Sequence, residues 1–321
     1  MNILLKSWYY RHWWNYLLLP FACIFYIISV FRRCFYSIGI FKQYKIALPV
    51  IVVGNITVGG TGKTPLVIYL VEQLKQHGFR PAVISRGYGR RNRHLQFVTA
   101  DSSVRLVGDE PLVIAQRTQC PVVVCPNRVE AARAVMEKTD ANIIISDDGL
   151  QHYALARDIE IVVIDGMRRL GNGMLLPAGP LREPASRMSS IDFIINNGDD
   201  RKNEIEMNLI VDQCFHLPTR QAVALTDFVG KTVHAVAGIG NPKRFFNTLI
   251  AAGIKIIPHD FSDHHFFTEQ ELNFGDDLLI FMTEKDAVKC TTFFNPKMYC
   301  VTVNAHLPDC FMPQLLAKLK G

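Results

Sequence analysis

Acidic residues are absent from the first 71 positions of this 321-residue chain, and Glu72 is the first carboxylate. The same stretch carries seven bases, beginning with Lys6 and ending with Lys63. Beyond it the bases and acids nearly balance, so the net charge of +6 resides in the N-terminal arm. No compact stripe of lysine and arginine follows, which argues against nucleic acid as a partner.

Paired cysteines are absent as well. The eight cysteines form no C-x-x-C pair and show no regular spacing. This argues against a zinc site or a disulfide framework and favours a reducing cytoplasm. The sequence also lacks a repeat of fixed period and a low-complexity tract. Its length suffices for two domains or one large one, and its 49% apolar content is that of an ordinary globular core.

Residues 1–45 hold all three tryptophans and an uncharged run from Trp13 to Phe31, closed by Arg32 and Arg33. Tryptophan and tyrosine favour the headgroup zone of a bilayer, and bases favour anionic leaflets. No small-x-small cleavage site follows, which argues against a signal peptide. The run is barely long enough to span a bilayer, so we predict a helix lying in, or dipping into, the cytoplasmic leaflet. A single span and an ordinary buried helix are the alternatives.

The central motif runs from Ile51 to Thr64: an apolar run, a glycine-rich turn and Gly-Lys-Thr, with a helix-like segment from Pro65. Such a turn presents backbone N–H groups to an anion at a helix N-terminus. Lys63 is placed to reach the β- and γ-phosphates of a nucleotide, and the Thr64 hydroxyl to bind Mg²⁺. The predicted cradle consists of Thr57, Val58, Gly59, Gly60, Thr61, Gly62, Lys63 and Thr64. Thr57 stands where the strict pattern has glycine, and the alternative is a loop that binds nothing.

Strands and helices alternate after this motif. We predict strands over 46–53, 80–85, 121–125, 142–146, 160–164 and 193–196, with helices over 65–77, 112–117 and 128–138. This order favours a parallel sheet covered on both faces, with ligands at the carboxyl ends of its strands. The pattern loosens over 211–223. A second α/β set follows, with strands over 232–237, 255–258, 278–283 and 298–303 and a helix over 242–252.

We therefore predict an α/β protein in three parts. Residues 1–45 form a membrane-associated arm, 46–215 a P-loop core with a parallel sheet, and 216–321 a smaller C-terminal α/β subdomain. A P-loop needs a second acid near Mg²⁺, usually at the end of an apolar strand. Asp147 and Asp148 follow one such strand and Asp165 follows another. The pair is the stronger candidate, because Gly149 leaves room for a ligand; the alternative for each is a simple strand-end turn.

Three further segments place charged groups together. Gly108-Asp109-Glu110-Pro111 opens a predicted helix, where acids also serve as ordinary capping residues. Asp263-His264-His265 suggests proton handling more than metal binding, because adjacent side chains on a strand point in opposite directions. Pro180 to Pro184 encloses an Arg-Glu pair, which a surface salt-bridging turn also explains.

Together these segments resemble the tetraacyldisaccharide 4'-kinase family, the lipid A kinases of Gram-negative bacteria. The matching stretches are Gly54-Asn55 through Thr64-Pro65, Ser85 to Arg90, Val107 to Pro111, Asn127-Arg128, Asp147 to His152, Pro177 to Glu183, Ala237 to Pro242, Asp263 to His265 and Thr283 to Lys289. They occur in order over nearly the whole chain, and their combination is specific although each alone is weak.

The resemblance implies transfer of the γ-phosphate of ATP to the 4'-hydroxyl of a tetraacylated disaccharide 1-phosphate, with Mg²⁺ as cofactor. It implies Asp109 as the base and His264 as its partner, with His265 left open as the alternative. Its metal and phosphate positions fall on Lys63, Thr64, Asp147, Asp148 and Glu183. Its positions near the substrate and phosphates fall on Arg86, Tyr88, Gln151, His152 and Arg182.

The resemblance also implies a C-terminal subdomain that closes over the nucleotide on a two-stranded hinge. It implies a location on the cytoplasmic face of the bacterial inner membrane, with an acylated disaccharide lipid as substrate. We infer no obligate protein partner from the sequence. One rival is a ParA/MinD-like membrane-associated ATPase switch. The signature lysine of that class precedes the Gly-Gly of the loop, where this chain has Val58. The other rival is a nucleotide-dependent scaffold that transfers no phosphate.

Overall fold

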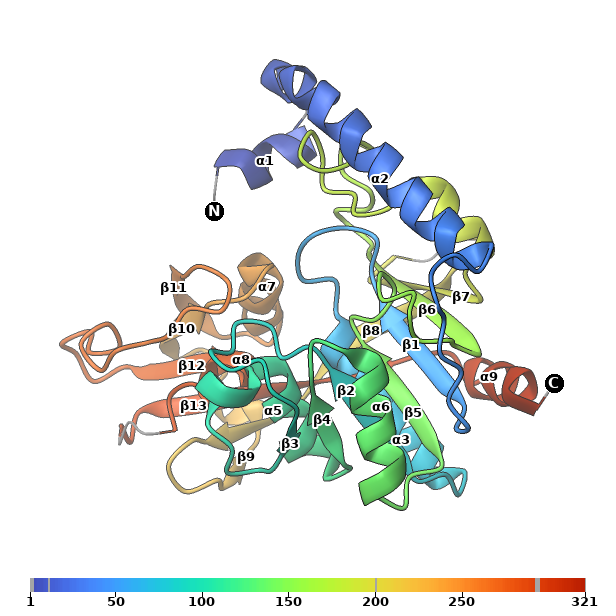
Figure 1. Ribbon diagram of the computed structural model, residues 1–321. Helices are drawn as coiled ribbons and strands as arrows, with labels where there is room; N and C mark the ends of the chain where they lie inside the picture. Colours follow the sequence, from blue (N-terminus) through green and yellow to red (C-terminus); the bar gives the residue numbers. More distant parts are fainter. Residues whose placement is uncertain (1–2, 11, 200, 292–294, 321) are drawn as a thin grey trace.

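A computed structural model describes residues 3–10, 12–199, 201–291 and 295–320. Thirteen strands form one sheet in the order β11-β10-β12-β13-β8-β7-β6-β1-β5-β2-β4-β3, with β9 paired to β8 (Figure 1). The first seven strands are β1 (Val50–Gly54), β2 (Pro81–Ser85), β3 (Gln96–Val98), β4 (Val122–Val124), β5 (Ile143–Asp147), β6 (Ile159–Asp165) and β7 (Phe193–Asn197). The others are β8 (Ile205–His216), β9 (Ala222–Val223), β10 (Thr232–Ala237), β11 (Lys255–Asp260), β12 (Leu279–Thr283) and β13 (Met298–His306).

The helices lie on both faces of the sheet and in the arm. They are α1 (Ile3–Tyr10), α2 (Leu19–Ser37), α3 (Lys63–Gln76), α4 (Val104–Val107), α5 (Asp109–Thr118), α6 (Arg128–Lys138), α7 (Pro242–Ala251), α8 (Glu284–Ala287) and α9 (Phe311–Lys320). Three 3₁₀ segments are η1 (Trp13–Leu18), η2 (Ala185–Ser190) and η3 (Leu225–Phe228).

The first half of the sheet is a parallel core centred on β1, which pairs with β5 on one side and β6 on the other. These three strands are runs of valine and isoleucine buried on both faces, as a parallel sheet requires. Apolar residues of α3, α5 and α9 cover one face, and those of α6 cover the other. The prediction of an α/β, P-loop-like parallel core is confirmed.

The second half has its own parallel strands, β11, β10, β12 and β13. β8 joins the halves: its first residues pair with β7, and from Asn208 onward it runs antiparallel to β13. Although the sequence pattern loosens over 211–223, residues 211–216 belong to β8, because partners far along the chain supply the strand's hydrogen bonds. The division at residues 215 and 216 stays a prediction, and α9 returns to pack on the core face.

The arm lies against one end of the core. The Trp8 indole N–H donates to the Pro177 carbonyl over 3.0 Å, and the Asn172 N–H donates to the Trp8 carbonyl over 2.8 Å. Figure 1 shows α2 extending away from the sheet. Residues Trp13–Ser37 are long and apolar enough to cross a membrane, and 11% of their most apolar window is buried. Pro20 lies in the first turn of α2, where its missing N–H costs no hydrogen bond.

Candidate active site

The glycine-rich turn connects β1 to α3 at the carboxyl edge of the sheet. Gly59 and Gly62 have φ of 113° and 99°, a region that residues with side chains rarely adopt. A Cβ on Gly62 would lie 2.4 Å from the Asn197 amide nitrogen, which donates to the Thr61 carbonyl over 2.9 Å. In the described part of the chain, the N–H groups of residues 60–62 donate to no protein acceptor. The turn therefore offers a row of donors that fits an anion.

Lys63 opens α3 and lies beside Asp148, which follows β5. Its Nζ is 3.5 Å from Asp148 Oδ1, and Arg182 Nη1 is 3.2 Å from both carboxylate oxygens. Burial opposes ionisation of Asp148, but these two cations lower its pKa to about 2. Asp148 has a φ of 48°, an unusual conformation for a residue with a side chain and common at functional sites.

Asp147 ends β5 and is fully buried. Ser85 donates to its Oδ2 over 3.0 Å, while its Oδ1 is buried without a hydrogen-bond partner. Burial, followed by the charges of Glu110 and Asp148, raises the pKa of Asp147 to about 7. An unpartnered buried carboxylate oxygen is costly unless a cation or donor binds it.

These residues fit a magnesium ion. The Thr64 hydroxyl and the carboxylates of Asp147 and Asp148 are the hard oxygen ligands that Mg²⁺ prefers. Among the described residues, no group of three or more His, Cys, Asp or Glu side chains is arranged to hold a metal unaided. An ion here would complete its shell with phosphate oxygens and water, as Mg²⁺ commonly does in nucleotide sites.

Glu183 lies close to the turn because the Pro180–Glu183 segment runs beside it. The Val58 N–H donates to the Pro180 carbonyl over 2.8 Å, and the Arg182 N–H donates to the Ile56 carbonyl over 2.7 Å. The Glu183 carboxylate is buried and accepts from Gln151 over 2.7 Å and from the Tyr153 hydroxyl over 2.6 Å. Protein donors thus already occupy Glu183, so its contact with a metal stays a prediction.

Asp109 and His264 meet from opposite halves of the molecule. The His264 Nδ1 is 2.8 Å from Asp109 Oδ2, whereas His265 Nε2 lies 3.1 Å from Glu271 Oε1. The geometry therefore pairs Asp109 with His264 and not with His265. His264 has a φ of 61° and stacks obliquely on the Tyr88 ring at 5.0 Å.

The charges around this pair favour an ion pair. Burial opposes ionisation of Asp109, but the hydrogen bond from His264 and the charges of Lys285 and Lys289 lower its pKa to about 2. Burial likewise disfavours charged His264, yet its bond to Asp109 raises its pKa above the ordinary value. The hydrogen bond therefore favours the ionised form of Asp109, and the His264 ring fixes the direction of the carboxylate.

His152 lies in a strongly basic region. Burial, then the charges of Arg128, Arg157, Arg32 and Arg86, lowers its pKa to about 4. It lines a cavity of about 380 Å³ together with Tyr44, Asn127, Val129, Glu130, Arg133 and Ala154. A neutral imidazole among cations fits a region that receives an anionic or polar ligand.

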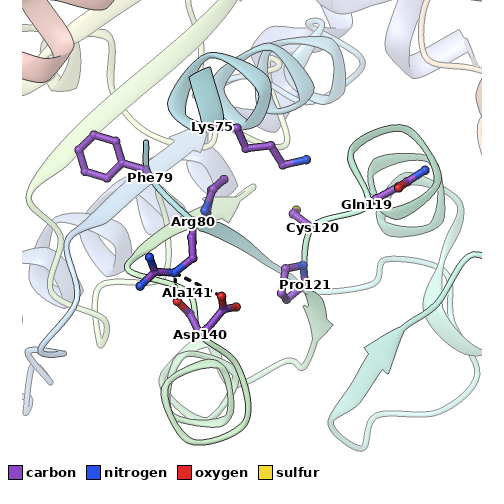
Figure 2. Close-up of a pocket in the computed structure, with 9 residues that line it drawn as sticks. Lys75, Phe79, Arg80, Gln119, Cys120, Pro121, Asp140 and Ala141 are labelled. Carbon is purple, nitrogen blue, oxygen red and sulfur yellow. Dashed lines mark hydrogen bonds and ion pairs between the residues drawn. The ribbon is translucent and has the colours of Figure 1, made fainter. Parts of the chain in front are cut away.

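A second cavity, of about 170 Å³, contains none of the predicted site residues. Figure 2 shows that Lys75, Arg80, Cys120 and Asp140 are among its lining residues, with Arg80 paired to Asp140. Arg80, Cys120 and Asp140 lie just before the amino ends of β2, β4 and β5, and Lys75 lies near the end of α3. The cavity therefore lies at the sheet edge opposite the glycine turn.

Several residues that contact the site have no role in the sequence-based prediction. Arg128 is buried and donates to the Asp147 carbonyl over 3.1 Å, and burial lowers its pKa to about 10. Lys289 lies 4.0 Å from Asp109 and 2.8 Å from Asp286. Both fall within segments that carry the family resemblance, which is the signal that could have identified them. Asp165, the weaker metal candidate, instead contacts α7.

The comparisons with known proteins agree over nearly the full length. The model of the family described as tetraacyldisaccharide-1-P 4'-kinase matches residues 14–320. A tetraacyldisaccharide 4'-kinase of Methylobacillus flagellatus is 47% identical over 98% of this chain and 95% of its own length. The enzyme of that name from Aeromonas salmonicida is 48% identical over 99% of this chain and 96% of its own.

One solved structure is also similar throughout. It is the crystal structure of LpxK from Aquifex aeolicus in complex with ATP, which has a TM-score of 0.80 and 27% identity. The similarity covers 95% of this chain and 99% of that one.

Proposed function

The chain belongs to the tetraacyldisaccharide-1-P 4'-kinase family, and from that premise we propose how its residues perform the reaction. It is a lipid A kinase that transfers the γ-phosphate of ATP to the 4'-hydroxyl of a tetraacyldisaccharide 1-phosphate. The observation that carries the proposal is the Asp109–His264 pair at the edge that also holds the glycine turn. A nucleotide switch or scaffold has no need of such a base.

The glycine turn and Lys63 hold the nucleotide. The N–H groups of residues 60–62 donate hydrogen bonds to the negatively charged phosphates, and Lys63 reaches the β- and γ-phosphates. Thr64, Asp147 and Asp148 hold Mg²⁺, which neutralises charge on the phosphate oxygens when bound. The Lys63 Nζ lies 3.5 Å from the Asp148 carboxylate, and this ion pair directs the lysine side chain towards the proposed phosphate and Mg²⁺ positions. Glu183 supports the same region through Gln151 and Tyr153.

Asp109 receives the proton of the acceptor hydroxyl. Its low pKa makes it a weak base, but phosphoryl transfer through a loose transition state demands little proton removal until late. His264 keeps the carboxylate ionised and aimed, so Asp109 stays ready without prior proton loss. Five further residues bind or orient the acceptor and the phosphates: Arg86, Tyr88, Gln151, His152 and Arg182.

We place the arm in the cytoplasmic leaflet of the inner membrane. The support is a set of exposed apolar side chains on η1 and α2: Leu17, Phe21, Ile24, Ile27, Ile28 and Phe31 are each more than half exposed. An acceptor with four acyl chains stays in the bilayer, so the enzyme must approach it there. No nucleic acid or obligate protein partner enters this proposal.

The decisive experiment measures transfer of labelled γ-phosphate from ATP to the tetraacyldisaccharide 1-phosphate in detergent micelles. Wild type should label the lipid, and His264→Ala should lower the rate by about 10² or more. His265→Ala is the matched control, because its imidazole pairs with Glu271 and not with Asp109. A rate of ATP hydrolysis that does not depend on the lipid, with no labelled lipid formed, would favour the ATPase switch.

A further inference from the structure

Asp165 ends β6 and is 2% exposed, yet the proposed chemistry does not use it. Its Oδ1 accepts the N–H groups of Met167 and Arg168 over 3.1 and 3.0 Å. Its Oδ2 lies 3.3 Å from Arg244 Nη2 and 3.3 Å from the Asn241 amide nitrogen. The carboxylate therefore joins the core half of the sheet to the start of α7 in the second half.

The two arginines extend this connection to the phosphate turn. Arg168 donates from Nη1 to the Gly240 carbonyl over 2.8 Å. Arg244 also donates to the Asn197 carbonyl over 3.2 Å, and the Asn197 amide donates to the Thr61 carbonyl over 2.9 Å. A continuous polar network thus runs from α7 to the glycine turn.

The segment held by this network lies directly against the turn. A Cβ on Gly240 would be 2.5 Å from the Gly60 nitrogen and 3.1 Å from its Cα. Only glycine allows that approach, because any side chain would collide with backbone. Gly240 and Gly60 come from different halves, so the distance between the two halves determines how closely the Gly240 segment packs against the glycine turn.

We propose that Asp165, Arg168 and Arg244 form a clasp between the two halves and thereby set the affinity for the nucleotide. They are positioning residues, and the inference rests on the proposed nucleotide site. Apparent affinity falls with the fraction of molecules in the binding-competent arrangement. Removing the cation beside a buried carboxylate such as Asp165 is strongly destabilising, because the negative charge is left uncompensated. Loss of the clasp lowers the fraction of molecules in which the two halves are held together around the glycine turn. It does not alter the residues proposed to contact the reacting atoms.

The test compares Arg244→Gln and Asp165→Asn with Arg169→Gln. Arg169 is a matched control: it is as exposed as Arg244, at 24%, and pairs with Glu204 at 2.6 Å within the core half. Three measurements are made on the full chain in detergent. The first is amide hydrogen exchange of residues 238–245 without nucleotide, the second is the Kd of a non-hydrolysable ATP analogue by calorimetry, and the third is kcat for lipid labelling at saturating ATP.

Both clasp variants should exchange faster at 238–245 and bind the analogue about tenfold more weakly, with kcat at saturating ATP nearly unchanged. Arg169→Gln should match wild type in all three. Unchanged affinity in Arg244→Gln overturns the proposal, and this variant decides alone if Asp165→Asn does not fold. Wild-type protein that binds no analogue would refute the proposed function instead, and exchange would then decide the clasp by itself.

Discussion

Asp109→Asn is the perturbation that best separates proton transfer from structure. Asparagine keeps the shape of the side chain and can still accept the His264 N–H, but it removes the charge and the base. We expect turnover to fall by about 10² to 10⁴, the usual contribution of a positioned base. The Kd for ATP should change little, because Lys63 and the turn bind the phosphates.

The structure also gives the size of the stability change. The difference between an ordinary Asp pKa of 3.8 and about 2 in the folded protein corresponds to a stabilisation on the order of 2 kcal/mol. Because the folded pKa of Asp109 is depressed, this stabilisation is complete above pH 4 and disappears as the pH falls towards 2. The free energy of unfolding of Asp109→Asn should therefore be lower than that of wild type by on the order of 2 kcal/mol at neutral pH, and the difference should shrink as the pH falls from 4 to 2.

His264 provides an independent readout. Its folded pKa is raised by Asp109, so its contribution is present below its ordinary pKa and is lost as the pH rises through the raised value. In Asp109→Asn the pKa of His264 should fall, as an NMR titration of the imidazole would record. Glu271→Gln is the control, since Glu271 pairs with His265 and not with His264.

The assays are lipid phosphorylation and urea unfolding in detergent at several pH values. Turnover of Asp109→Asn within about threefold of wild type would refute Asp109 as the base. A stability difference that grows below pH 4 would refute the sign derived from the depressed pKa.

Lys63→Ala should weaken ATP binding and lower turnover by about 10² or more, measured by calorimetry and lipid labelling; near-normal affinity would contradict the phosphate role. Chelation by EDTA should stop transfer, and added Mg²⁺ should restore it, while activity that survives EDTA would remove Mg²⁺ from the mechanism. Deleting residues 1–37 should release the protein from phospholipid vesicles in a sedimentation assay, and folded protein that still sediments would mean another surface binds the membrane. Arg182→Gln, which removes one of the two cations beside Asp148, should lower turnover measurably, whereas Arg80→Gln at the opposite sheet edge should not.

Much of the fold could be predicted because its signals are local. Runs of valine and isoleucine predicted β1, β5 and β6, and the helical spacing after Pro65 predicted α3. The full course of β8 escaped prediction, because its later residues gain their hydrogen bonds from β13, some ninety residues away. Local patterning carries no information on such a partner.

The sequence by itself determined the chemistry available: a glycine turn ending in Lys63 and Thr64, a carboxylate pair at the end of β5, and an apolar arm that carries basic residues. Only the tertiary structure decided which groups meet. It chose His264 over His265 for Asp109, and it turned Asp165 from a metal candidate into a link to Arg244. The physical reason is that residue type and spacing fix what a side chain can do, whereas contacts between the two halves depend on how the sheet brings distant segments together.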